Sequence, residues 1–378
     1  MKEPISYKWS LGLWASIVTL LGASAAPVPV YFGTGGSETK GIYRASFDAD
    51  TGKLSGATLA AQLGSPGFLA WGPDGSRLYA VGNLPAGPGV VGYKAQADGS
   101  LSLINSSTIG DGGAAHLAVH PSGRFLLTAQ YGGGSVALFP LDEAGRLGSA
   151  EIIRHESASG IVPIRQDKPH PHWCGFSPDA AFALVPDLGM DAIIVYRVTL
   201  SDASPHIHFH GKIPSDPGAG PRHMRFSVDG KWIYLLNELA LTVNTYAWSP
   251  VEGTAKLISS VPALATEVKD KEVANSAAEV LVHPSGRFVY SSNRGHDSVT
   301  VYQATPGTGD LKVVEVEPVR GALPRNINLD PSGRWLLAGG ADSNTVSVFR
   351  VDESSGELRF QPKAVINVPG PICILFGR

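Results

Sequence analysis

Residues 220–238 read GPRHMRFSVDGKWIYLLNE, and this stretch predicts the unit from which the rest of the chain is built. It holds an apolar strand, a tight turn at residues 228–231 and a second apolar strand that ends on an Asn-Glu pair. Because two strands joined by a tight turn run antiparallel, the start of the first lies beside the end of the second. We therefore expect Arg222 and His223 to lie near Glu238.

The same pattern of strand, turn and strand recurs along the chain at a spacing of about fifty residues, each time followed by a second turn and a strand of alternating character. The copies begin at Pro66, Ala114, Pro171, Pro221, Ala277 and Pro324. Units of this length with four short strands are typical of β-propeller blades. The 45 Gly and 28 Pro residues agree with an all-β chain that has many turns.

The two ends of the chain complete each other. Beyond residue 27 come three strands that lack an inner strand, and residues 370–376 (GPICILF) resemble an inner strand alone. The sequence therefore predicts a seven-bladed β-propeller whose last blade is closed by one C-terminal and three N-terminal strands. Such closure leaves no sheet edge open to aggregation.

The N-terminus has the features of a secretory signal. Lys2 and Lys8 precede an apolar run over residues 11–23, and small residues follow it. The run is shorter than the roughly 20 residues of a membrane-spanning helix. We expect a signal peptide at residues 1–26, a propeller domain at residues 27–378, export to the periplasm or the cell exterior, and no membrane association after cleavage.

Charge and composition favour a small-molecule partner. The net charge of −3 and the absence of a basic stripe give no reason to expect nucleic acid. The Gly-rich segments lack the strand-to-helix setting of a phosphate-binding loop, so we expect no cofactor. Cys174 and Cys373 fall on inner strands of separate blades, and we expect two free, buried thiols.

Three alternating histidines form the other candidate cluster. His206, His208 and His210 share one face of a predicted strand, which is a pattern that could bind a metal ion. The repeat makes this strand the outermost of its blade, so we expect a solvated face and no metal site.

The repeat also predicts where a binding pocket would lie. In a propeller the inner strands line a central channel, and the start of each inner strand meets the end of the next strand at one mouth of that channel. Two insertions, residues 157–168 and 266–276, precede inner strands and are expected to form loops at this rim. The polar residues at the converging positions include His116, His172, Arg222, His223, Glu238, Glu279, Asn293, Arg294, Arg325 and Asn326.

Such a ring could bind an anionic or polyhydroxylated ligand and supply a general base. Structural roles are the alternative. His116 and His223 could be hydrogen-bonded core histidines, and the charged residues could form a salt-bridge network between blades. Asn83 and Asp187 lie at turns, where such side chains commonly bind backbone N–H groups.

The motifs at these positions resemble those of the seven-bladed propeller lactonases, which include the propeller type of 6-phosphogluconolactonase and the fungal carboxy-muconate lactonizing enzyme. The resemblance covers nearly the whole chain beyond the predicted signal. The matching motifs are Pro171-His172, Pro186-Asp187-Leu188-Gly189, Gly220-Pro221-Arg222-His223, Asn237-Glu238-Leu239, Ala277-Ala278-Glu279, Ser292-Asn293-Arg294-Gly295-His296-Asp297 and Pro324-Arg325-Asn326.

The resemblance implies that His172, Arg222, Glu238 and Arg294 are the catalytic residues. The other six polar residues of the ring would bind substrate. The expected activity is hydrolysis of a sugar-derived lactone without a metal, with Glu238 or His172 as general base and arginines that stabilise the oxyanion. Two alternatives stay open: a cycloisomerase that forms lactones from a muconate, and a non-catalytic exported propeller that binds a ligand or protein.

Overall fold

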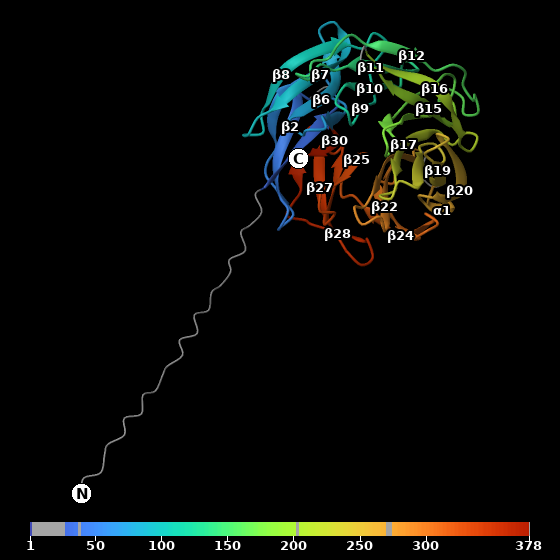
Figure 1. The fold of residues 1–378 in the computed structure, drawn as a ribbon. Coiled ribbons are helices and arrows are strands. Elements are labelled where there is room, and N and C mark those ends of the chain that lie inside the picture. Colours follow the sequence, from blue (N-terminus) through green and yellow to red (C-terminus); the bar gives the residue numbers. More distant parts are fainter. Residues whose placement is uncertain (2–26, 37–38, 202–203, 270–273, 378) are drawn as a thin grey trace.

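The computed structural model describes residues 27–377 apart from gaps at 37–38, 202–203 and 270–273, together with Met1. The predicted signal peptide therefore lies outside the described residues, Met1 excepted. Among the residues described, none of the helical segments has the length and apolar character needed to cross a membrane. Short antiparallel strands form seven sheets that surround a common centre, as predicted (Figure 1).

Five sheets each contain four consecutive strands that run from the channel outward. The first two comprise β5 (Leu69–Trp71), β6 (Arg77–Leu84), β7 (Gly87–Ala95) and β8 (Leu101–Thr108), then β9 (His116–Val119), β10 (Phe125–Gln130), β11 (Ser135–Pro140) and β12 (Glu151–Arg154). The next two comprise β13 (Gly175–Phe176), β14 (Phe182–Asp187), β15 (Ala192–Leu200) and β16 (Pro205–Pro214), then β17 (Pro221–Phe226), β18 (Trp232–Asn237), β19 (Thr242–Ser249) and β20 (Thr254–Pro262). The fifth comprises β21 (Ser276–Val282), β22 (Phe288–Arg294), β23 (Ser298–Ala304) and β24 (Leu311–Pro318).

The remaining two sheets have outer strands that are broken in two. One comprises β25 (Pro324–Leu329), β26 (Trp335–Gly340), β27 (Thr345–Val351), β28 (Leu358–Phe360) and β29 (Ile366–Asn367). The other comprises β30 (Pro371–Phe376), β1 (Val28–Thr34), β2 (Gly41–Asp48), β3 (Lys53–Leu54) and β4 (Thr58–Gln62).

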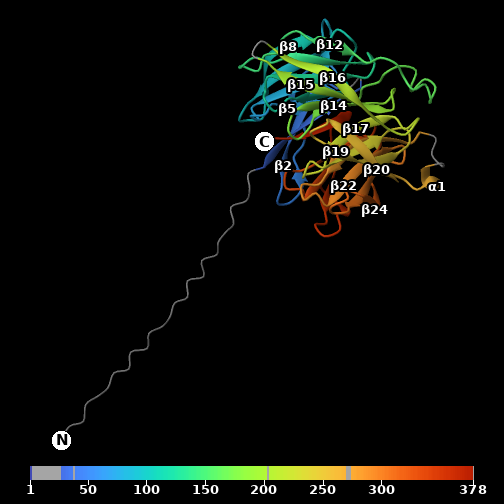
Figure 2. The same cartoon turned by 45° about the vertical axis from the view of Figure 1, so that its right-hand side comes forward.

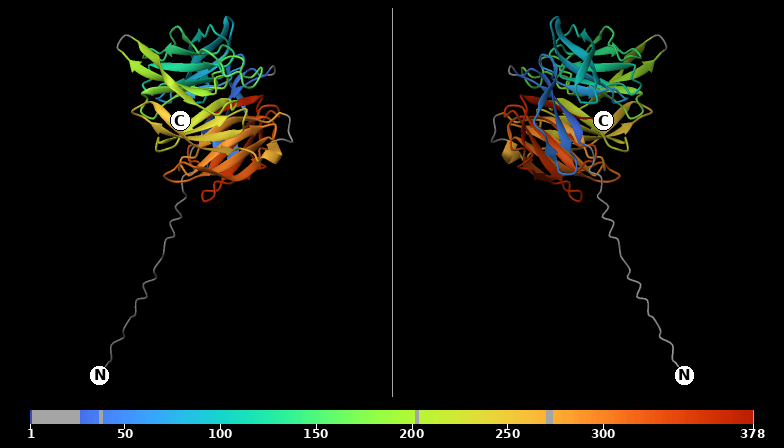
Figure 3. Two further views of the ribbon diagram at one scale, coloured as in Figure 1. Left: turned by 90° about the vertical axis from the view of Figure 1, so that its right-hand side faces the viewer. Right: turned by 90° about the vertical axis from the view of Figure 1, so that its left-hand side faces the viewer.

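The closing blade confirms the predicted union of the two ends. Strand β30 pairs antiparallel with β1, with Val30 opposite Phe376 and Gly33 opposite Cys373. The indole N–H of Trp71, in the neighbouring blade, donates to the carbonyl oxygen of Phe376 at 2.8 Å. In the right-hand view of Figure 3 the first strands, in blue, lie against the last ones, in red.

The blades are held together by apolar side chains between adjacent sheets. The second strand of a blade is buried on both faces, and every residue of β10 is buried. Outer strands such as β20 are largely exposed, since only one of their faces meets a neighbour. Cys174 and Cys373 are free and buried, as predicted.

The turn within residues 220–238 shows why the repeat folds this way. Asp229 Oδ1 accepts hydrogen bonds from Ser227 Oγ at 2.6 Å and from the N–H of Lys231 at 3.2 Å. Gly230 has φ of 71°, a left-handed conformation that costs glycine little. The turn fixes the register that sets β17 beside β18.

The insertion at residues 266–276 contains the helix α1 (Thr266–Lys269), which Figure 2 shows at the periphery beyond β20. The ammonium group of Lys269 donates to the carbonyl oxygen of Ala240 at 3.0 Å. Because Ala240 follows the end of β18, this contact agrees with a position near the rim where the second strands end.

Candidate active site

Two arginines reach the mouth of the channel because of β-bulges in the inner strands. In β17, Pro221 lies opposite Asn237 and His223 lies opposite the preceding residue of β18, so Arg222 is an extra residue. Strand β25 has the same irregularity between Pro324 and Asn326, which makes Arg325 the extra residue there. A bulge changes the direction of a side chain, and bulges are common beside functional sites.

Three arginines share the carboxylate of Glu238. Arg222 Nε donates to Glu238 Oε2 at 3.0 Å, and a terminal nitrogen of Arg294 lies 3.2 Å from Oε1. Arg165 donates to the same Oε1 at 2.5 Å. The prediction that Arg222 and Glu238 lie together is therefore confirmed.

Because this cluster is buried, its charges interact strongly and shift the pKa values of Glu238 and Arg222. Arg222 and Glu238 are 1% and 5% exposed. Burial alone would raise the pKa of the Glu238 carboxyl, but the three guanidinium groups outweigh it and lower the pKa to about 2. Burial, together with the charge of Arg294, lowers the pKa of Arg222 to about 9, which still leaves that guanidinium charged at neutral pH.

His172 lies in the same cluster as a neutral imidazole. Burial and the nearby charge of Arg222 hold the pKa of His172 well below its ordinary value. Its ring centroid is 5.4 Å from that of Tyr131 and 5.2 Å from that of His223. Its Nδ1 atom is buried and has no hydrogen-bond partner among the described residues.

Two arginines at the mouth have N–H groups that could donate hydrogen bonds to an anion. Arg294 Nε is buried without a hydrogen-bond partner in the part of the chain that the structure describes. Arg325 is half-buried, and burial and the charge of Arg294 lower its pKa. A hollow of about 530 Å³ opens beside Arg325, lined also by Leu323 and Ile372; Arg325 is the one member of the arginine cluster that borders it. Its size suits a small-molecule ligand.

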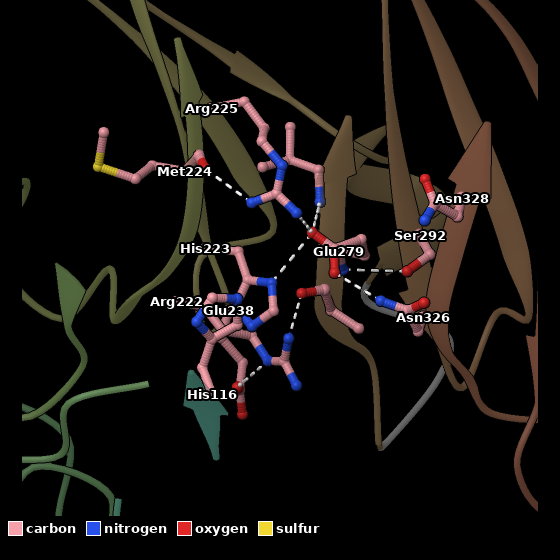
Figure 4. A network of polar contacts seen from close by, with 12 residues as sticks. His116, Arg222, His223, Met224, Arg225, Glu238, Glu279, Ser292, Asn326 and Asn328 are labelled. Atoms are coloured by element: carbon pink, nitrogen blue, oxygen red, sulfur yellow. Dashed lines mark hydrogen bonds and ion pairs between the residues drawn. The ribbon is translucent and has the colours of Figure 1, made fainter. Parts of the chain in front are cut away.

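A second buried carboxylate, that of Glu279, lies in the polar network that Figure 4 shows beside Arg222 and His223. Glu279 Oε1 accepts hydrogen bonds from Arg225 at 2.9 Å and lies 3.0 Å from His223 Nδ1, and Oε2 accepts one from Asn326 at 2.7 Å. Burial would raise the pKa of Glu279, but the charges of His223 and Arg225 lower it to about 2. Glu279 therefore orients His223 beneath the mouth.

A plug of three aromatic side chains lies between His172 and a cavity at the other end of the channel. We define the plug as Phe68, His116 and His223; the ring of His116 is 4.1 Å from that of Phe68 and 5.6 Å from that of His223. His116 Nδ1 accepts a hydrogen bond from the N–H of Cys174 at 3.3 Å. Beyond the plug a cavity of about 630 Å³ opens at the other end, lined by His116 and Arg225 among others.

The structure thus sorts the predicted site residues by depth. His172, Arg222, Glu238, Arg294 and Arg325 come together at the mouth. His116, His223, Glu279 and Asn326 lie in or beneath the plug layer, where protein partners satisfy them in part.

Asn293 does not join either group. Its amide nitrogen donates to Ser298 Oγ at 3.0 Å and to Thr300 Oγ1 at 2.9 Å, both on the neighbouring strand β23. Its substrate-binding role stays a prediction that this geometry does not favour. At Asp187, Oδ1 accepts hydrogen bonds from the N–H groups of His170 and Met190, which confirms the backbone-binding role expected for that residue.

Sequence reasoning missed Arg165, the third cation on Glu238. It lies in the insertion at residues 157–168, which was expected to form a rim loop but has no counterpart in the repeat. Arg165 also donates to the hydroxyl of Tyr131 at 3.4 Å. The ring of Tyr131 stacks on His170 at 4.4 Å. The presence of an insertion in the sequence indicated that a loop could reach the site. The length of the insertion does not predict which of its side chains points into the site.

We expect the folded protein to lose stability as the pH falls from about 6.5 to about 2. Glu238 and Glu279 have folded-state pKa values of about 2 against an ordinary 4.5, so their contribution is present above pH 4.5 and lost as the pH falls toward 2. The pKa values of His116 and His172 are lowered, so the unfolded chain takes up their protons first as the pH falls, which acts in the same direction. Urea unfolding over this pH range measures the effect, and a midpoint that stays constant from pH 7 to pH 3 would contradict it.

Comparisons with known proteins agree with this geometry. The family profile described as "Lactonase, 7-bladed beta-propeller" matches residues 29–376. The chain is 33% identical to the 6-phosphogluconolactonase of Bacillus subtilis, over 92% of this chain and 97% of that protein. It is 32% identical to the 6-phosphogluconolactonase of Formosa agariphila, over 86% of this chain and 92% of that protein.

Among solved structures, the fold is similar to that of the periplasmic gluconolactonase PpgL of Pseudomonas aeruginosa. The TM-score is 0.87 at 27% identity, over 93% of this chain and 99% of that one. The match of the family profile to most of the chain, the two relatives above 30% identity and the shared fold point to the same group of lactone hydrolases. The chain therefore belongs to the seven-bladed β-propeller lactonase family.

Proposed function

We propose that the protein hydrolyses a sugar-derived lactone to its open-chain acid at the mouth defined by His172, Arg222, Glu238 and Arg294. The observation that carries the proposal is the excess of cationic donors there. Glu238 is shared by three arginines, Arg325 lies nearby, and the buried Nε of Arg294 has no partner in the described chain. Such donors suit an oxyanion that develops during the reaction.

The reaction begins with water. As the water oxygen bonds to the lactone carbonyl carbon, a ring nitrogen of His172 accepts one of its protons, and Arg222 and Arg294 donate hydrogen bonds to the oxyanion. Collapse of this intermediate reforms the carbonyl and breaks the ring ester bond. The departing oxygen takes the proton from His172, and the new carboxylic acid ionises, which releases one proton to solvent.

Glu238 fixes the arginines in this scheme. With a pKa of about 2 it is a weak base at neutral pH, although it was one of the two general bases that the sequence suggested. His172 is neutral and so can accept a proton. The charges that lower the pKa of His172 are partly offset once an oxyanion or an anionic substrate binds, which increases its basicity at the reacting step.

The names of the relatives suggest the substrate and the compartment. A gluconolactone, phosphorylated or not, is the proposed substrate, because the related proteins are named for the two forms. Export of this chain is proposed on the basis of its N-terminal pattern, and it is supported by the likeness to a periplasmic protein.

The test is proton release by the purified protein on glucono-δ-lactone and its 6-phosphate, compared with the H172A variant. We expect turnover by the wild type and a kcat about 10²–10⁴-fold lower in H172A, since general-base catalysis contributes about that much. His208 is an exposed histidine on the outer strand β16, and H208A is the matched control. It should retain wild-type activity.

Wild-type activity in H172A would overturn the role of His172. No turnover on either lactone, with the protein folded, would overturn the proposed hydrolysis. A change in ultraviolet absorbance with a muconate would then favour the cycloisomerase.

A further inference from the structure

Arg165 enters the site from an insertion outside the repeat. The other two cations on Glu238 project from strands of the blades, Arg222 from β17 and Arg294 from β22. Arg165 comes from the loop between β12 and β13, yet its contact with Glu238, at 2.5 Å, is the shortest of the three.

The loop does not need Arg165 to hold its shape. Gln166 is fully buried, and its amide nitrogen donates to the carbonyl oxygen of Leu188 at 2.8 Å and to Asp191 Oδ1 at 2.7 Å. Lys168 donates to the carbonyl oxygen of Gly132 at 2.6 Å. Anchors on the C-terminal side of Arg165 therefore hold the backbone of the loop independently of its side chain.

Glu238 does not need Arg165 either, because two buried arginines already neutralise it. The exposure of the three side chains differs: 2% for Arg222, 10% for Arg294 and 38% for Arg165. Arg165 is thus the cation that can leave the carboxylate at the least cost in buried, unpaired charge.

We propose that Arg165 determines substrate specificity by leaving Glu238 to bind an anionic group of the substrate, one that is remote from the ester. This inference rests on the proposed lactonase function. A phosphate or carboxylate that enters the mouth competes with Glu238 Oε1 for the guanidinium group, whose paired N–H donors match such oxygens. When a neutral lactone binds, Arg165 stays paired with Glu238 and makes no contact with the substrate.

The experiment measures kcat and KM of the wild type, R165Q and R165K on glucono-δ-lactone and on its 6-phosphate. We expect the wild type to prefer the phosphorylated lactone. In R165Q the ratio of the two kcat/KM values should fall about tenfold or more, mainly through KM for the phosphorylated lactone, because one charge-assisted contact is lost. R165K keeps the charge and should retain most of the preference.

The matched control is R154Q. Arg154 is an exposed arginine at the start of the same loop that pairs with Asp111 at 2.8 Å. The R154Q substitution should leave the ratio of the two kcat/KM values unchanged. Thermal melting of each variant checks that it is folded.

The outcomes separate the two proposals. Equal losses on both lactones in R165Q would assign Arg165 a structural role, and an unchanged ratio or a wild-type preference for the neutral lactone would overturn its role in specificity. Absence of turnover by the wild type on both substrates would instead contradict the proposed function.

Discussion

Replacing Glu238 by Gln is expected to lower kcat by about 10²–10³-fold, because the arginines proposed to stabilise the oxyanion lose the charge that aligns them. The carboxylate accepts hydrogen bonds from Arg165 and Arg222 and forms an ion pair with Arg294, whereas an uncharged amide has one acceptor oxygen and an NH₂ group that cannot accept. Steady-state proton release on the best lactone measures the loss.

The same change should also destabilise the fold, since it leaves Arg222 buried without a counter-charge. Breaking a buried pair costs about 3–5 kcal/mol, so the assay is run well below the melting temperature and the folded fraction is checked by circular dichroism. Glu317 pairs with Arg320 near the surface at 3.0 Å, and E317Q is the matched control. If folded E238Q turned over at the wild-type rate, the arginine cluster would have no part in catalysis.

Truncation after Gly370 is expected to abolish cooperative folding. It removes β30, so β1 loses its partner on the channel side and becomes an open edge. The hydrogen bond from Trp71 and the contact between Phe376 and Phe47, whose rings are 5.5 Å apart, are lost as well. Circular dichroism and gel filtration should show an unfolded or aggregated chain.

A single substitution in β30 tests the same closure with a smaller expected loss of stability. F376A leaves the backbone of β30 in place and removes a side chain that is 6% exposed, so it should cost about 3–5 kcal/mol in the free energy of unfolding. L257A, on an exposed position of the outer strand β20, should change it by less than about 0.5 kcal/mol. A truncated chain that unfolds with the wild-type midpoint would show that the closure contributes nothing.

The sequence predicted the fold nearly completely because each blade is a local unit. The turn around Gly230 and the alternation of apolar strands specify the hairpin without help from distant residues. The closure by β30 could be predicted because residues 370–376 resemble an inner strand and the N-terminal strands lack one. Strand breaks such as the one between β28 and β29 are irregularities that the repeat does not encode.

The site was predicted less completely, for two physical reasons. The bulge at Arg222 shifts the register by one residue, so alternation along β17 does not say which side chains face the mouth and which lie deeper. Glu279 was expected at the mouth, and its carboxylate is paired with His223 and Arg225, which alternation along the strands does not predict. Arg165 belongs to an irregular loop, whose conformation depends on anchors such as Gln166 that no periodic pattern predicts.

The plug of Phe68, His116 and His223 makes the site a dead end. Its two histidines are buried and their rings contact each other, so we expect no passage for a sugar-sized molecule between them. We therefore expect substrate to enter and product to leave by the same opening. In the proposed reaction the acid formed in each turnover is an anion that leaves past the same arginines that bind the lactone, so we expect it to compete with the next substrate for the free enzyme.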